Sequence, residues 1–152
     1  MLVFGPEIER HFPLPAFAHR PGQNNRPEED LKAPVQDSVE MRVTDDNWQQ
    51  HGAYLYGFVL YRAGFYWEAH EVWEPVWMQC PPNSRERLLL QAIIQIANAG
   101  LKEALGNAQA SARLQGIAVG QLKEILARRR SVDTGQPLLG IDVEALMEQL
   151  KN

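Results

Sequence analysis

The sequence predicts an all-α fold: an antiparallel helical bundle of four main helices plus a short C-terminal helix, preceded by a Pro-rich extended N-terminal arm. From about residue 47 onward, apolar side chains recur at helical spacing, and no segment shows strand-like alternation of useful length. Six of the ten prolines fall within residues 1–43, where missing backbone donors disfavour sustained helix. We therefore expect an arm over residues 1–43 and a single helical domain over residues 44–152.

The composition is typical of a cytoplasmic protein without a membrane partner. A chain of 152 residues can bury a core without disulfides or metal, and its single cysteine, Cys80, cannot form an internal disulfide. The sequence shows no signal peptide, and no apolar stretch reaches membrane-spanning length. The net charge of −4 lies in the N-terminal third, so a basic surface for nucleic acid is missing and we expect no nucleic-acid partner.

The arm carries more apolar side chains than a solvated tail needs. Its apolar residues are Phe4, Ile8, Phe12, Leu14 and Phe17. We expect them to dock on the helical body, either of the same chain or of a second copy. The alternative is a disordered tail.

Capping and breaking residues mark the first two helices. Thr44–Asp46 offers N-caps for a first helix, which Gly64 ends. A second helix spans about residues 65–78. Pro75 is expected to kink or end it, because proline cannot donate to the preceding turn.

The C-terminal half predicts two long helices and a short one. Ser84 can cap a third helix over about residues 85–105, which is apolar around most of its circumference and hence central in the fold. Gly106 and Asn107 separate it from a fourth helix over about residues 108–129. Asp142 caps the short last helix. The short connections favour antiparallel neighbours.

One histidine lies among acids and tryptophans on the second helix. His70 and Glu74 are four residues apart, so their side chains meet on one helix face, whereas Glu71 is expected to diverge from that pair. Oriented by Glu74, His70 could act as a general acid or base. His70, Glu71 and Glu74 are therefore the candidate catalytic residues.

The same pair could hold a divalent metal. Catalytic zinc normally has three protein ligands and an open position, but the pattern His-Glu-x-x-Glu lacks the second histidine of zinc proteases. The third helix has no acid between Glu86 and Glu103 to supply another ligand. A metal at His70 and Glu74 is thus the alternative to an ion pair or a hydrogen-bonded network.

A polar stripe on the third helix could face His70 across a groove. The stripe runs from Arg87 to Lys102 with spacings of four, four, three and four residues, so its members lie on one line. Its last four members and two aromatic residues form the candidate ligand-binding set: Tyr61, Trp77, Gln91, Gln95, Asn98 and Lys102. The alternatives are simple solvent contact for the stripe and a core or interface position for the tryptophans.

Two stretches resemble a known family. They are YRAGFYWEAHEVWEPVW at 61–77 and LLQAIIQIA at 89–97, the second followed by Gly106 and Asn107. Over about residues 47–127 the chain is similar to domain of unknown function family 309, small prokaryotic helical proteins whose signature HExxE followed by Trp matches His70, Glu71, Glu74 and Trp77. Pro75 departs from that pattern. The resemblance implies an all-α bundle and no assigned activity.

A weaker, local resemblance is to one tetratricopeptide hairpin. It is carried by small and aromatic positions that let two helices approach closely: Gly57, Gly64, Tyr66, Ala69, Trp73 and Pro81. A solenoid needs at least three such repeats.

Two functions remain open at this point. One is a non-catalytic binding or interaction module whose His/Glu/Gln cluster fixes packing or binds a partner or small ligand. The other is a small enzyme or metal-binding protein that uses His70, Glu71 and Glu74. A functional site should leave His70 and Glu74 lining an open pocket, whereas a structural role should pair both ring nitrogens with protein groups. The aromatic content is also compatible with a homodimer.

Overall fold

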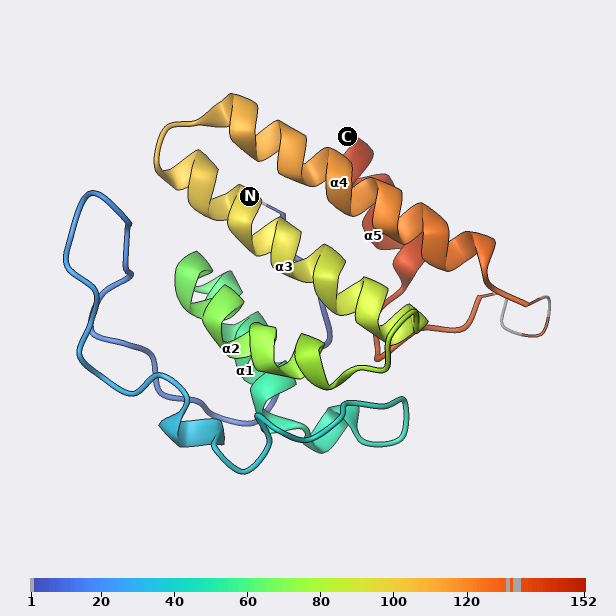
Figure 1. The fold of residues 1–152 in the computed structure, drawn as a ribbon, viewed down its shortest axis with the longest axis horizontal. Helices are drawn as coiled ribbons and strands as arrows, with labels where there is room; N and C mark the ends of the chain where they lie inside the picture. The colour runs from blue at the N-terminus through green and yellow to red at the C-terminus, as the bar shows by residue number, and fades with distance from the viewer. Residues whose placement is uncertain (1, 131, 133–134) are drawn as a thin grey trace.

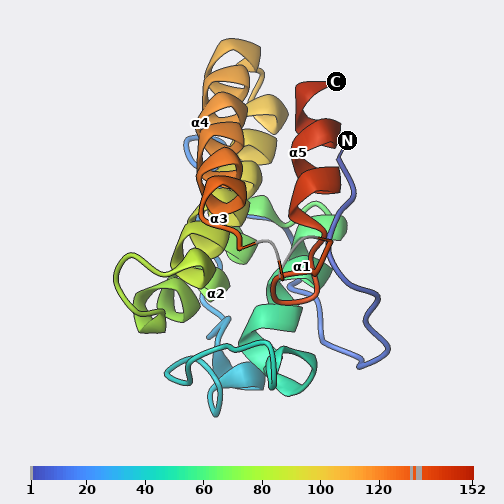
Figure 2. The same cartoon turned by 90° about the vertical axis from the view of Figure 1, so that its right-hand side faces the viewer.

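The computed structural model describes residues 2–130, 132 and 135–152, and its five main helices confirm the predicted all-α bundle. The elements are two short 3₁₀ turns followed by the helices: η1 (Ala33–Val35), η2 (Trp48–Gln50), α1 (Gly52–Arg62), α2 (Tyr66–Gln79), α3 (Arg85–Ala104), α4 (Ala108–Ala127) and α5 (Val143–Lys151). Helices α1 and α2 form one hairpin, and α3 and α4 form a longer one that packs on α2 (Figure 1). Helix α5 runs beside α4 and ends near the N-terminus of the chain (Figure 2). Among the described residues, no helix is both long and apolar enough to cross a bilayer.

The turns that reverse the chain follow the predicted chemistry. Gly64 has a φ of +87°, and Phe65 donates its N–H to the carbonyl of Leu60 at 2.8 Å, which closes a Schellman motif at the end of α1. Gly106 ends α3 in the same way, with a φ of +83°. The predicted cap of α3 is also present, since Oγ of Ser84 accepts the N–H of the third residue along at 3.1 Å.

The N-cap of α1 is His51, so the prediction of Thr44–Asp46 was wrong. Nδ1 of the buried His51 ring accepts the N–H of Tyr54 at 3.2 Å. The carboxylate of Asp45 is used elsewhere, because it accepts the N–H of Leu139 at 2.8 Å. A good capping side chain was therefore engaged by a loop near the other end of the chain.

Helix α2 continues through Pro75 to Gln79, so it does not end at Pro75, which was one of the two outcomes expected there. Residue 75 cannot donate to the carbonyl of Glu71. The fully buried side chains of Trp73 and Val76 hold this part of α2 in the core. Tertiary packing therefore outweighs the local cost of the proline.

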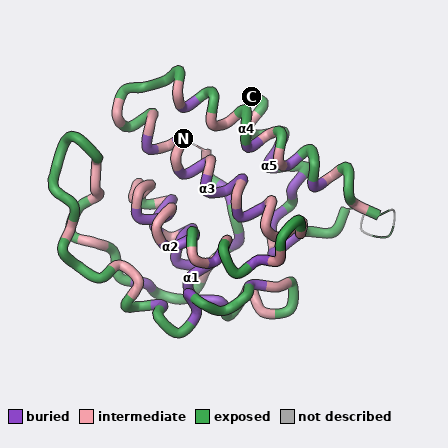
Figure 3. Tube along the Cα trace, viewed as in Figure 1, coloured by how far each residue is buried: buried purple, intermediate pink, exposed green. Residues whose placement is uncertain are grey.

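Two glycines bring aromatic rings of α2 against the neighbouring helices. A Cβ at Gly57 of α1 would overlap the indole of Trp73, whose Nε1–H donates to the carbonyl of Tyr54 at 3.0 Å. A Cβ at Gly100 of α3 would lie 2.8 Å from the ring of Tyr66. These close approaches place buried residues along the inner faces of the helices, shown in purple in Figure 3.

The N-terminal arm lies on the helices of its own chain. Phe4 packs edge-on against the ring of Tyr61 at a centroid distance of 5.1 Å, and Phe12 stacks on Tyr56 at 5.1 Å. Leu14 and Phe17, by contrast, remain 51% and 46% exposed. Docking therefore holds for the first part of the predicted apolar set and fails for its last two members.

Candidate functional site

His70 lies where α2 meets α3, and both of its ring nitrogens have partners. Nδ1 is 2.8 Å from Oδ1 of Asn98, and Nε2 is 3.0 Å from Oε2 of Glu74. The side chain of His70 is 28% exposed and that of Glu74 is 49% exposed. The pairing matches the expectation for a structural histidine, while the exposure leaves both side chains accessible from solvent.

The partners of His70 constrain what this cluster can hold. If Oδ1 of Asn98 accepts, Nδ1 carries a proton, and Nε2 faces the Glu74 carboxylate either with a second proton or with a lone pair. A lone pair on Nε2 and the carboxylate of Glu74 could together coordinate a cation. The opposite orientation of the Asn98 amide gives a neutral histidine that donates from Nε2 to Glu74.

Glu71 lies closer to this pair than helix geometry predicted. One ligand atom from each of His70, Glu71 and Glu74 lies within 4.8 Å of the other two. The predicted divergence of Glu71 was wrong because a glutamate side chain is long enough to lean back toward its neighbour. All three residues could therefore ligate one ion.

The rest of the polar stripe contributes less than predicted. Gln91, Gln95 and Lys102 are partly buried on the same line of α3 as Asn98. Within the described part of the chain, the structure shows no hydrogen bond from their side chains to the His70 cluster. Only Asn98 joins the stripe to the histidine.

The two predicted aromatic residues lie in other surroundings. Tyr61 is 2% exposed and lines a separate pocket of about 200 Å³ together with Tyr66 and Glu103. Trp77 lies under the guanidinium of Arg87, which is 4.4 Å from its ring centroid. Among the described residues, neither aromatic side chain forms a hydrogen bond or ring contact with His70, Glu71 or Glu74.

Glu68 is a buried acid that the sequence reasoning missed. It lies in the first turn of α2 and is 1% exposed. Its Oε2 accepts the backbone N–H of His19 at 2.7 Å, whereas its Oε1 is buried without a hydrogen-bond partner in the described structure. Burial raises the pKa of this carboxyl, and the hydrogen bond from His19 opposes that rise.

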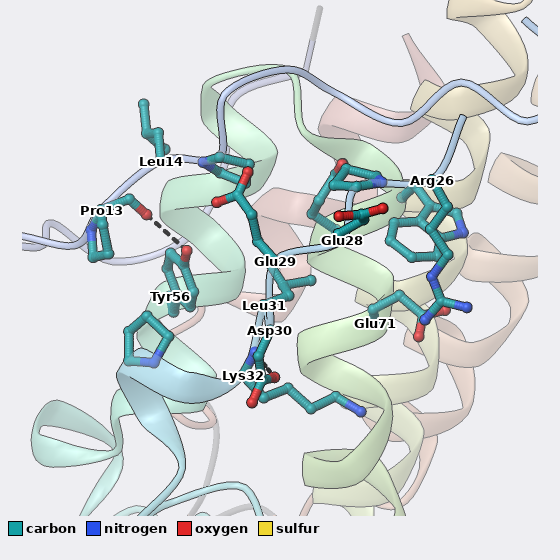
Figure 4. Close-up of a pocket in the computed structure, with 15 residues that line it drawn as sticks. Pro13, Leu14, Arg26, Glu28, Glu29, Asp30, Leu31, Lys32, Tyr56 and Glu71 are labelled. Carbon is teal, nitrogen blue, oxygen red and sulfur yellow. Dashed lines mark hydrogen bonds between the residues drawn. The ribbon is translucent and has the colours of Figure 1, made fainter. Parts of the chain in front are cut away.

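Glu68 lines a pocket of about 400 Å³ between the arm and the helices, here called the arm pocket. The helices contribute Tyr56 from α1 and Trp67, Glu68 and Glu71 from α2. Figure 4 shows the arm segment at residues 26–32 running past Tyr56 and Glu71. The volume of the arm pocket falls within the range of small-molecule binding sites.

Specific contacts hold the arm over this pocket. Nη2 of Arg20 donates to the carbonyl of Gly64 at 3.0 Å. The indole of Trp67 meets the edge of the His19 ring at 4.8 Å and the guanidinium of Arg26 at 5.0 Å. The arm is thus part of the site, and Trp67 connects it to α2.

One sequence signal pointed toward this pocket. Glu68 and Glu71 are three residues apart and therefore share a helix face, which differs from the face that meets Asn98. No local pattern, however, places His19 or Arg26 against that face. The pocket depends on contacts between residues more than forty positions apart.

Comparison with known proteins gives one match, to part of the helical region. The model of a family described as Domain of unknown function (DUF309) matches residues 54–114, which run from α1 into the first turns of α4. This segment includes Glu68 and the His70 cluster, while the arm lies outside it. Neither the curated proteins nor the solved structures gave a match.

Proposed function

Residues 54–114 match the model of the DUF309 family, and we propose that the chain is a non-catalytic binding module whose small-molecule ligand occupies the arm pocket. The observation that carries this proposal is the buried Oε1 of Glu68, which has no partner in the described structure. An unpaired polar atom in a protein interior costs about 1–3 kcal/mol. A ligand that donates a hydrogen bond to Oε1 would remove that cost.

The residues around the pocket favour binding over catalysis. Its described lining contains carboxylates but no serine, threonine, cysteine or histidine that could form a nucleophile–base pair. The single cysteine, Cys80, is a poor nucleophile, because it is 2% exposed and burial raises the pKa of its thiol to about 11. Its thiol therefore stays protonated at neutral pH.

A fragment screen observed by ¹H–¹⁵N NMR tests this proposal. We expect fragments that bind to shift the backbone amide of His19 and the indole N–H of Trp67, since both groups adjoin Glu68 or line the pocket. The variant Glu68→Gln should bind the same fragments more weakly, whereas Glu148→Gln on α5 removes the same charge far from the pocket. A screen in which no fragment moves these two resonances would overturn the proposal.

A second candidate function is the binding of a divalent cation. The observation that favours it is the convergence of three side chains that can ligate a metal. His70, Glu71 and Glu74 offer one nitrogen and two oxygens within 4.8 Å, and Asn98 orients the imidazole. Such a site would make the chain a metal-binding protein or a small metal-dependent enzyme.

Elemental analysis and calorimetric titration with Zn²⁺ and Mn²⁺ test the cation site. Stoichiometric binding by the parent protein, lost in His70→Ala and kept in Glu148→Gln, is the result expected for this site. Equal binding by the parent and His70→Ala would reject it. The absence of a nucleic-acid partner, a homodimer and a cytoplasmic location stay predictions from the sequence.

A further inference from the structure

The unpaired oxygen of Glu68 indicates what kind of group the arm pocket should receive. Oε2 accepts the N–H of His19, whereas Oε1 is buried and meets no donor among the described residues. A neutral donor would satisfy the hydrogen bond alone. A cationic donor would also compensate the buried negative charge, and charge-assisted hydrogen bonds are roughly twice as strong as neutral ones.

The charges around the pocket select the same kind of ligand. Five lining residues are acidic and two are basic: Glu28, Glu29, Asp30, Glu68 and Glu71 against Arg26 and Lys32. A cleft lined mainly by one sign of charge concentrates ions of the opposite sign. Figure 4 shows Glu28 and Glu29 on the arm segment that runs between Tyr56 and Glu71. Anionic ligands would enter against this field.

The uncharged part of the wall suits a compact apolar body. Leu14 and Leu31 line the pocket together with several prolines, and Tyr56 and Trp67 add aromatic surface. The guanidinium of Arg26 lies 5.0 Å from the Trp67 ring centroid, so the ring already accepts a cation on one face. A cavity of about 400 Å³ has room for a ligand of this type.

From these observations, and resting on the proposed function, we propose that the arm pocket binds a small organic cation. The ligand would carry a primary ammonium group on a compact apolar body. The ammonium donates to Oε1 of Glu68, and the apolar body lies against Trp67 and the prolines of the arm.

Three probes of similar size and different charge test the ligand class. Benzylamine, benzyl alcohol and benzoate share a phenyl ring and carry a positive charge, no charge and a negative charge at pH 7. Each is titrated into the 152-residue protein while the His19 amide and the Trp67 indole are followed by NMR. We expect benzylamine to shift both resonances with an affinity at least tenfold higher than that of benzyl alcohol, and benzoate to leave them unchanged.

The variants show whether Glu68 is the recognising group. Glu68→Gln should weaken benzylamine binding at least tenfold, while Glu148→Gln, with the same change in net charge, should bind as the parent does. Benzyl alcohol binding as tightly as benzylamine, or undiminished binding by Glu68→Gln, would overturn the cation inference and leave the pocket as a binding site. The comparison among probes uses the parent protein alone, so it stands even where a variant fails to fold.

The failure of all three probes would also overturn the cation inference. The proposed function is judged separately by the broader fragment screen, which includes uncharged and anionic compounds. Fragments of those classes that shift the His19 and Trp67 resonances would keep the binding function and replace the ligand class.

Discussion

Oε2 of Glu68 accepts the backbone N–H of His19 at 2.7 Å, and this hydrogen bond joins α2 to the arm across 49 residues of sequence. The bond lies next to an oxygen of the same carboxyl that has no partner in the described structure. The Glu68 side chain therefore holds the arm through one carboxyl oxygen, while the other oxygen lacks a hydrogen-bond donor. Its titration should be visible in the stability of the protein.

Glu68 should make the protein less stable as the pH rises from acidic toward neutral. Burial raises the pKa of Glu68 above 4.5, so the folded state binds the proton more tightly than the unfolded state. The contribution to stability is fully present below the unfolded pKa and is lost as the pH rises through the higher folded pKa. Glu68→Gln removes this titration, so the variant should gain stability relative to the parent over that window.

Urea unfolding of both proteins at several pH values between 4 and 7 measures this difference. Glu148→Gln serves as the control, because Glu148 is exposed and only 3.8 Å from Lys151 in a surface pair. Parallel stability curves for the parent and Glu68→Gln would contradict the assignment of a raised pKa.

Arg62→Met should release the beginning of the arm. The Arg62 guanidinium donates to the carbonyl of Phe4 at 3.2 and 2.8 Å and to the carbonyl of Pro6 at 2.7 Å. Hydrogen bonds to charged groups contribute about 1.5–3 kcal/mol, so opening of this segment should become roughly tenfold or more frequent. Limited trypsin digestion after Arg10 reports that opening.

The exposed Arg113 on α4 supplies the matched control. Arg113→Met removes a charge and a trypsin site but no contact with the arm, so cleavage after Arg10 should proceed at the parent rate. Equal cleavage rates in Arg62→Met and the parent would show that the buried Phe4 alone holds the segment.

Much of the fold was predictable because its signals are local. Gly64 supplies a left-handed residue where α1 must end, and Ser84 supplies a cap where α3 begins. The pairing of His70 with Glu74 is also local, since it follows from a spacing of four residues. Each of these features depends on residues within one or two turns of one another.

The features that escaped prediction depend on contacts far apart in sequence. Asp45 was expected to cap α1, but it binds the N–H of Leu139, a residue 94 positions away. In the sequence, Glu68 looks like any acidic residue in the first turn of a helix. Only the structure shows that the arm covers it and that His19 donates a hydrogen bond to it. The arm side of the candidate pocket escaped prediction for the same reason as the true cap, because tertiary contacts decide which partner a polar side chain binds.

Gly57→Ala should destabilise the core strongly. The new Cβ would overlap the indole of Trp73, which is fully buried and donates to the carbonyl of Tyr54 at 3.0 Å. Overpacking of this kind costs about 1–3 kcal/mol, and displacement of the indole would add the loss of its hydrogen bond. The thermal midpoint and the near-ultraviolet circular dichroism should both change.

Gly116→Ala separates this steric effect from helix propensity. Gly116 lies within α4, and a Cβ there would meet nothing within 4 Å. The substitution should therefore stabilise the protein by about 0.5–1 kcal/mol, since glycine is a poor helix former. Stabilisation by Gly57→Ala as well would show that the α1–α2 contact can yield around Trp73.

Pro75→Ala should stabilise the protein, because α2 is helical on both sides of this position. Pro75 has no N–H for the carbonyl of Glu71, and proline is about 3 kcal/mol less favourable than alanine within a helix. Part of that difference is offset by the greater freedom of the unfolded chain, so we expect a gain of about 1–2 kcal/mol in the free energy of unfolding. Urea unfolding measures the gain, with Pro81→Ala in the following loop as a control that should not stabilise. An unchanged or lower stability of Pro75→Ala would mean that packing of the proline ring stabilises α2. Pro75 itself would then contribute more to the continuity of the helix than the buried Trp73 and Val76 do.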